Sequence, residues 1–114
     1  GYNIDMANSF KLSTASSVGT AEVSVYECPA NTSTTIIGLT VANIINSQIA
    51  VDVKINDGGS SKIHLVKNAP VPAGGTLVVV GGDQKVVLEP TDVIIVQSDT
   101  ASSGDVTMSY LEIT

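Results

Sequence analysis

Few side chains in this 114-residue sequence are of the types that carry out chemistry, and their spacing matches no known catalytic arrangement. The only histidine, His64, alternates with Ile63 and Leu65 in the stretch KIHLVK, which places it on the solvent or interface face of a strand. A serine hydrolase triad would need this histidine beside a nucleophilic serine, and the sequence has no G-x-S-x-G motif. We therefore predict that His64 is a surface residue, that there are no catalytic residues, and that the chain is not an enzyme.

The single cysteine, Cys28, precedes Pro29 at the end of an expected strand. Without a second cysteine the chain cannot form an internal disulfide, which fits folding in a reducing cytoplasm. In this position we interpret Cys28 as a small buried apolar group rather than a nucleophile. One histidine and one cysteine do not readily supply a zinc site, so we predict no metal ligands.

The carboxylates offer one alternative, a weak calcium site. Asp99 and Asp105 bracket the loop TASSG, while Asp57 and Asp83 lie in glycine-rich turns. Such loops can bind calcium through carboxylate and carbonyl oxygens. Aspartates in turns more often accept hydrogen bonds from their own backbone, and we favour that interpretation. The stretch GGTLVVVGGDQK matches neither nucleotide-binding glycine motif, so no cofactor is predicted.

Composition excludes two classes of partner. The formal net charge is −6, and there is no arginine. A nucleic-acid-binding protein needs clustered cations to replace phosphate counterions, whereas the lysines here are well spread, at Lys11, Lys54, Lys62, Lys67 and Lys85. No stretch reaches the roughly 18 apolar residues of a membrane span. We predict neither a nucleic-acid partner nor a membrane partner, and interpret the acidic surface as an aid to solubility.

Alternation of apolar and polar residues predicts the elements that hold these side chains. In QIAVDVKIN, one face would carry Ile49, Val51, Val53 and Ile55, as in a strand with one buried side. The preceding stretch TTIIGLTVANII would place on one face Ile37, Leu39, Val41 and Asn43. The short break at 46–48 predicts that these two strands form a hairpin. The turn at 56–61 predicts a second hairpin with KIHLVK.

The remaining strands are expected near 21–28, 76–80, 85–89, 92–98 and 106–114, with turns every 8–12 residues. That spacing is typical of an antiparallel sandwich or a small barrel. We predict an all-β fold, a single antiparallel β-sandwich of immunoglobulin-like or jelly-roll-like character with seven to eight short strands. The proline-containing loop 68–75 is expected to be an extended crossover between the sheets rather than a ladder strand. The runs 78–80 and 93–96 are apolar on both faces, which favours either a covering loop or contact with another chain.

The domain organisation is expected to be simple. Met6 reads as an initiator, so residues 1–5 are interpreted as a cloning remnant. Residues 6–20 are small, polar and largely unpatterned. They form either an N-terminal arm that orders against a neighbouring molecule or an ordinary edge strand. Residues 21–114 make up the sandwich domain.

The order of four segments carries a resemblance to a known group of proteins. These segments are YECPANTSTTIIGLTVAN, VDVKI, HLVKNAPVPAGGTLVVVGGDQKVVLEPTDVIIVQS and DVTMSYLEIT. Together they resemble small structural virion proteins of tailed bacteriophages, of the type found in phages of marine bacteria and cyanobacteria. The shared features are an Asn-ending strand at 39–43, a proline–glycine loop at 70–75, and the pattern formed by Leu88, Asp92, Ile94 and Val96.

The resemblance implies a non-enzymatic structural protein of the virion, assembled in the host cytoplasm. The resemblance implies a capsid decoration (cement) protein or a neck or tail component. Its implied partners are other virion proteins and copies of itself, with a trimer favoured. An alternative is a carbohydrate- or cell-surface-binding sandwich module, although the scarcity of aromatic residues argues against stacking on sugar rings.

Overall fold

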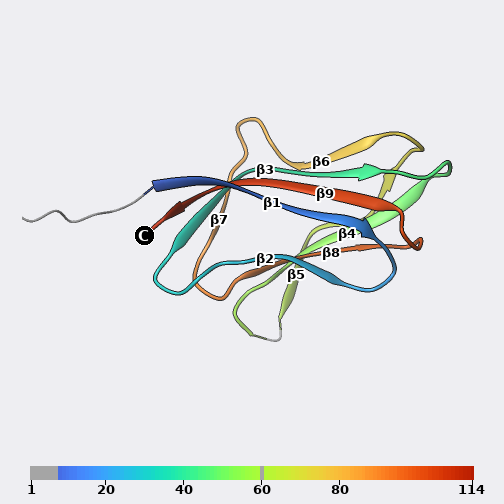
Figure 1. Ribbon diagram of the computed structural model, residues 1–114. Coiled ribbons are helices and arrows are strands. Elements are labelled where there is room, and N and C mark those ends of the chain that lie inside the picture. The colour runs from blue at the N-terminus through green and yellow to red at the C-terminus, as the bar shows by residue number, and fades with distance from the viewer. Residues whose placement is uncertain (1–7, 60) are drawn as a thin grey trace, which may run out of the picture.

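The computed structural model describes residues 8–59 and 61–114, and every regular element in these ranges is a β-strand. Two antiparallel sheets pack face to face (Figure 1), which confirms the predicted all-β sandwich. Nine strands are present instead of seven to eight: β1 (Asn8–Val18), β2 (Val23–Glu27), β3 (Ser33–Asn43), β4 (Ile49–Asn56), β5 (Lys62–Val71), β6 (Thr76–Val80), β7 (Val86–Leu88), β8 (Val93–Ser98) and β9 (Gly104–Ile113). Within these ranges no helix is long and apolar enough to cross a membrane.

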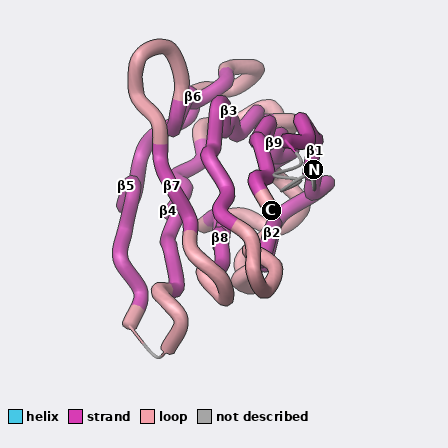
Figure 2. The backbone as a smooth tube through the Cα atoms, turned by 90° about the vertical axis from the view of Figure 1, so that its left-hand side faces the viewer, coloured by secondary structure: helices cyan, strands magenta, loops and turns pink. Residues whose placement is uncertain are grey.

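The strand order is that of a jelly roll rather than an immunoglobulin fold. The five-stranded sheet runs β1-β9-β3-β6, with β7 also paired to β3, and the four-stranded sheet runs β2-β8-β4-β5. The chain passes repeatedly from one sheet to the other, as in the double Greek key of jelly rolls. Figure 2 shows β5 at the outer margin of its sheet, beside β4.

The core between the sheets is almost entirely aliphatic. Along β4 the alternating residues Ile49, Val51 and Val53 are fully buried, as the sequence pattern predicted. The predicted hairpin of β4 with β5 is also confirmed, because these strands pair antiparallel. Strand β8 lies between β2 and β4, so its apolar run is buried mainly inside this chain.

The predicted hairpin between β3 and β4 is wrong, because these strands belong to different sheets. Alternation identifies a buried face but not the strand that pairs with it. The five residues at 44–48 are enough to bridge the roughly 10 Å between packed sheets. The buried Asn43 stabilises this corner: its Nδ2 donates to the carbonyls of Ser47, Val71 and Pro72, and its Oδ1 accepts from the Ile45 N–H.

A β-bulge changes which residues of β3 point into the core, so the predicted inward face of this strand is wrong at one position. Leu39, Val41 and Asn43 are buried as expected, but Ile37 is only partly buried and Ile36 is completely buried instead. The register with β9 slips between Ile36 and Gly38, so that one residue of β3 has no partner. A bulge of this kind inverts the inward and outward positions on either side of it.

The loop 68–75 is only partly the crossover that was expected. Strand β5 continues through Asn68 to Val71 and pairs with β4, including a ladder position for Pro70. Proline is tolerated there because β5 is an edge strand whose outer side needs no donor. The passage to the five-stranded sheet, correctly expected near this point, is confined to residues 72–75.

The strand beyond the predicted seven to eight lies at one edge of the five-stranded sheet. Residues 8–18 form the edge strand β1, paired with β9 over almost its whole length, which is the second of the two arrangements considered for the N-terminal region. The interpretation of residues 1–5 falls outside the described residues. On the opposite edge, β6 and β7 follow one another along β3, separated by residues 81–85, and act as one interrupted edge strand.

Candidate interaction surfaces

The histidine singled out in the sequence lies on the surface. His64 is exposed on β5, directly opposite Lys54 in the ladder. Its Nε2 lies 3.9 Å from the Asp52 Oδ2 atom, which is beyond hydrogen-bond range. This position agrees with the predicted surface exposure of His64.

The cysteine is buried, as predicted. Only 1% of Cys28 is accessible, and its Sγ lies 3.3 Å from both the Thr32 carbonyl oxygen and the Thr34 Oγ1. The thiol therefore fills a polar corner of the core rather than a purely apolar one. A thiol with these contacts is not available for reaction at the surface.

Two of the four loop aspartates, Asp99 and Asp105, accept hydrogen bonds from the backbone of other segments. Asp99 Oδ1 accepts a hydrogen bond from the Ala50 N–H at 3.1 Å, and this bond is the main reason why the pKa of Asp99 is lowered. Asp105 Oδ1 accepts from the Ser17 N–H at 2.9 Å. No group of three potential metal ligands occurs among residues 8–59 and 61–114.

A largely buried polar cluster, which the sequence analysis did not identify, joins four strands, β1, β2, β3 and β9. Glu112 on β9 accepts a hydrogen bond from Tyr26 on β2 at 2.5 Å and one from Lys11 on β1 at 2.7 Å. The Tyr26 hydroxyl also lies 2.8 Å from Thr34 Oγ1, and its ring packs on Tyr110 with centroids 4.4 Å apart. Alternation along β9 contained the signal, because Glu112 follows Val106, Met108 and Tyr110 on the inward face.

The cluster alters the acidity of its members. The hydrogen bond from Lys11, and then that from Tyr26, hold the pKa of Glu112 below its ordinary value. Burial, and then the bond to Glu112, raise the pKa of Tyr26. A carboxylate that receives two donors inside a protein stays ionised, so the cluster is a structural connection between the edge strand β1 and the core.

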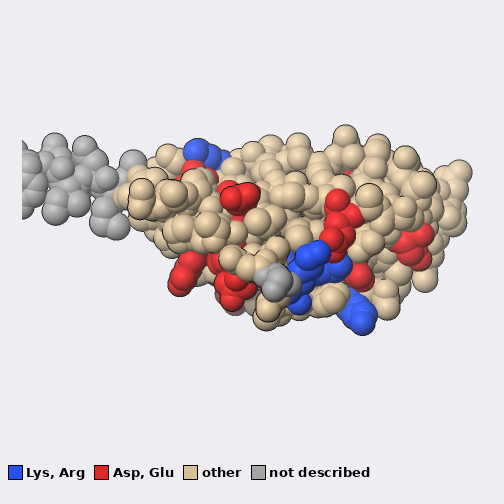
Figure 3. All heavy atoms as spheres, turned by 90° about the horizontal axis from the view of Figure 1, so that it is seen from below, with Lys and Arg blue, Asp and Glu red and all other residues tan. Residues whose placement is uncertain are grey.

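Charged side chains gather on the outer face of the four-stranded sheet. The Glu22 carboxylate lies 2.6 Å from Lys54 Nζ and 2.8 Å from Lys62 Nζ. These bonds, led by that from Lys54, lower the pKa of Glu22 to about 2. Figure 3 looks onto this side of the molecule and shows basic and acidic groups next to one another. This outer face is exposed to solvent, and its lysines and carboxylates form ion pairs with one another.

The outer face of the five-stranded sheet differs sharply. Register aligns its outward side chains in rows across β1, β9, β3 and the interrupted edge strand. One row is Phe10, Leu111, Thr35 and Val87, and another is Thr14, Thr107, Thr40 and Val78. Phe10 is 76% exposed and Leu12, on the same side of β1, is 63% exposed. We call this surface the neutral face, because both rows consist of aliphatic, aromatic and threonine side chains.

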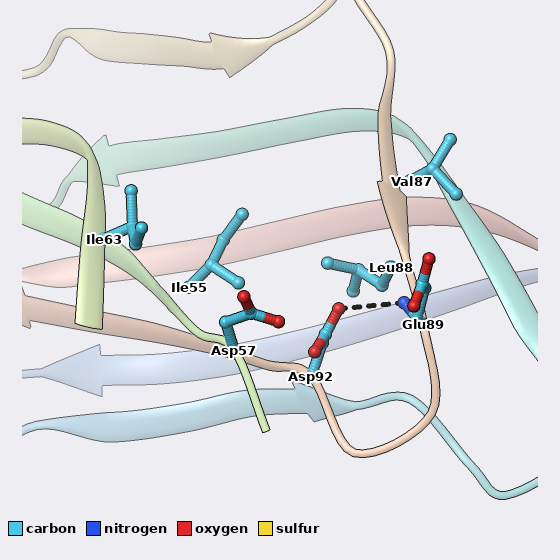
Figure 4. Close-up of a pocket in the computed structure, with 7 residues that line it drawn as sticks. All are labelled: Ile55, Asp57, Ile63, Val87, Leu88, Glu89 and Asp92. Carbon is cyan, nitrogen blue, oxygen red and sulfur yellow. Dashed lines mark hydrogen bonds between the residues drawn. The ribbon is translucent and has the colours of Figure 1, made fainter. Parts of the chain in front are cut away.

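A groove opens where the free edges of the two sheets meet. Its apolar lining comes from Ile55 and Ile63 on the β4–β5 hairpin and from Val87 and Leu88 on β7. Three carboxylates complete the lining, from Asp57, Glu89 and Asp92, and the space measures about 370 Å³ (Figure 4). We call it the edge groove.

One carboxylate of the edge groove already has a structural role. Asp92 is buried, and its Oδ2 accepts a hydrogen bond from the Glu89 N–H at 2.9 Å. Asp57 and Glu89 are exposed. The groove therefore presents an apolar floor with two free negative charges at its margin.

Comparison with known proteins places the fold but not a family. No family model matches the sequence, and no curated protein matches it significantly. A solved structure from Bacillus endospore appendages, described as a novel family of disulfide-linked pili, is similar with a TM-score of 0.55 and 11% sequence identity. The match covers 96% of this chain and 88% of that chain. At this identity the likeness concerns the β-sandwich fold alone.

Proposed function

We propose that this chain is a structural subunit that acts through protein–protein contacts, as a capsid decoration protein or a neck or tail component of a bacteriophage virion. The observation that carries the proposal is the contrast between the neutral face and the charged outer face of the four-stranded sheet. Large apolar side chains held outward on a regular sheet mark an interaction surface. The virion assignment is supported by the sequence resemblance described above.

The neutral face is large enough for a stable contact. Four strands about 4.8 Å apart and about ten residues long, at about 3.3 Å per residue, cover roughly 600 Å² per molecule. The neutral face and the surface that it meets on a neighbouring molecule together bury about twice this area, which approaches the roughly 1,200 Å² at which specific interfaces begin. Each copy has a net charge of −6, so copies repel one another through their charged surfaces. This electrostatic repulsion is weakest at the neutral face.

The expected assembly is a homo-oligomer, with a trimer favoured, located in the virion. A structural role is in keeping with the pilus protein whose fold this chain shares. Many copies arranged by symmetry can hold firmly even when each contact is weak, because binding at several sites is multivalent.

Sedimentation velocity of the full chain tests the proposal. The wild type is expected to sediment as an oligomer, with a trimer having three times the 11.7 kDa chain mass. Combining Phe10→Ser with Leu12→Ser is expected to yield monomers, because it removes the two most exposed apolar groups of the neutral face. Ile44→Ser is the matched control, since Ile44 is exposed in the β3–β4 loop, away from that face.

Two results would contradict the proposal. A wild type that stays monomeric at every concentration would refute the homo-oligomer. An oligomer that persists after the double substitution would show that the neutral face is not its interface. The virion assignment is tested separately by the gene neighbourhood, where capsid, portal or tail genes are expected beside this one.

A further inference from the structure

We propose that the edge groove binds an extended segment of another protein in which basic and branched aliphatic residues alternate. The first argument is the exposure of its apolar lining. Ile63 is 58% exposed and Val87 is 60% exposed, although each lies beside buried core residues. Ile63, with Ile55 and Leu88 beside it and Val87 at the margin, leaves the groove of about 370 Å³ open to an apolar side chain of similar size.

The second argument is the form of the groove walls. Among the described residues, β7 pairs only with β3, and β5 pairs only with β4. Both strands that border the groove are therefore edges, with backbone donors and acceptors directed away from their own sheets. An extended segment can use such groups for hydrogen bonds while placing alternate side chains on the apolar floor.

The third argument is charge. Asp57 and Glu89 are exposed at the groove margin, and neither is paired with a cation in the described part of the chain. Figure 4 shows the Asp57 carboxylate beside Ile55, between Ile63 and Asp92, and the Glu89 carboxylate on the other side of Asp92. A lysine or arginine next to the aliphatic group of the bound segment would meet these carboxylates. Electrostatic complementarity of this kind favours a basic partner and disfavours an acidic one.

This chain has one stretch in which basic and aliphatic residues alternate, Lys62 to Leu65, but it lies in β5, where its backbone pairs with β4 and Lys62 bonds to Glu22. The proposal therefore commits to a different protein as the partner. The edge groove and the neutral face share one residue, Val87, whereas Ile55, Ile63 and the three carboxylates belong to the groove alone.

Fluorescence anisotropy with a labelled model peptide tests the inference. The probe is a short capped peptide that alternates lysine with valine, and two comparison peptides replace all lysines by glutamate or all valines by serine. The wild type is expected to bind the lysine–valine peptide at least about tenfold more tightly than either comparison peptide, because each lacks one of the two complementary features. Raising the salt concentration is expected to weaken this binding, since exposed charge pairs are screened.

Matched variants locate the binding site. Combining Asp57→Asn with Glu89→Gln, and separately combining Ile63→Ser with Val87→Ser, are each expected to weaken binding about threefold to tenfold. The controls are Asp83→Asn, which lies outside the lining, and Val78→Ser, which removes an equally exposed aliphatic group from β6. Both controls are expected to bind as the wild type does. Circular dichroism spectra and melting curves verify that each variant is folded.

Three outcomes would overturn the inference. They are no saturable binding of the lysine–valine peptide, equal binding of the glutamate peptide, and groove variants that bind as tightly as the controls. Because all three are read from the anisotropy of an added peptide, they are distinct from the sedimentation results that test self-association.

Discussion

Replacing Tyr26 by phenylalanine tests whether the buried polar cluster stabilises the sandwich. The substitution removes one oxygen and keeps the ring that packs on Tyr110. It leaves the buried Glu112 Oε2 without its 2.5 Å donor and Thr34 Oγ1 without its 2.8 Å partner. Thr34 Oγ1 keeps a second partner in Cys28 Sγ, so the loss comes mainly from the hydrogen bond to the charged Glu112, and a loss of about 2–3 kcal/mol in the free energy of unfolding is expected.

Urea denaturation followed by circular dichroism measures this loss, and a thermal scan should show a melting temperature lower by about 8–12 °C. Tyr110→Phe is the matched control. Tyr110 belongs to the same ring pair, but its hydroxyl makes no hydrogen bond within the described residues. The control is expected to change the stability by less than about 0.5 kcal/mol. Equal effects of the two substitutions, or no effect of Tyr26→Phe, would refute the reasoning.

The same pair of proteins has a predicted pH dependence. The folded-state pKa of Glu112 is lowered from 4.5, first by Lys11 and then by Tyr26. A lowered carboxyl pKa contributes stability that is present above the unfolded pKa and is lost as the pH falls through the folded value. The difference in stability between the wild type and Tyr26→Phe should therefore be constant near neutrality and shrink below pH 4.5. A difference that grows on acidification would contradict this assignment.

Two further predictions concern other buried polar groups. Asn43→Ala should lower the free energy of unfolding, measured in urea, by about 3 kcal/mol. The reason is that three carbonyls and the Ile45 N–H lose their hydrogen-bond partner at the corner between the sheets. A loss below about 1 kcal/mol would contradict the stabilising role of Asn43. The Cys28 thiol should react with a thiol reagent about a thousandfold more slowly in the native protein than in denaturant, because reaction requires an opening of the core, and rapid native labelling would show that the thiol is accessible.

Much of the fold could be predicted from local patterns. The alternation in β4 identifies Val51 and Val53 as core residues, and the turn after Asn56 predicts the hairpin with β5. The partner of β3 could not be predicted, because alternation describes one strand at a time and sheet pairing depends on the whole chain. The bulge at Ile37 could have been suspected, because Gly38 interrupts the strand and glycine inside a strand often marks a bulge.

The candidate surfaces were less accessible to prediction than the core. Glu112 could have been identified, because its place in the alternation of β9 puts a carboxylate on the buried face. The edge groove could not, since its walls come from β5 and β7, which are brought together only by the order of strands in both sheets. The same applies to the rows of the neutral face, which depend on the register between strands distant in sequence.

The position of β9 has a consequence for how the protein is made. This strand is the last in chain order, yet it lies between β1 and β3 and pairs with both along most of its length. During translation, β1 has no neighbour to pair with until residues 104–113 have left the ribosome. The two layers can therefore close only once residues 104–113 have emerged, and the nascent chain would expose its aliphatic strands until then. Ribosomes stalled before Gly104 should carry chains that are readily digested by proteases, whereas nascent chains in which residues 104–113 have emerged should resist.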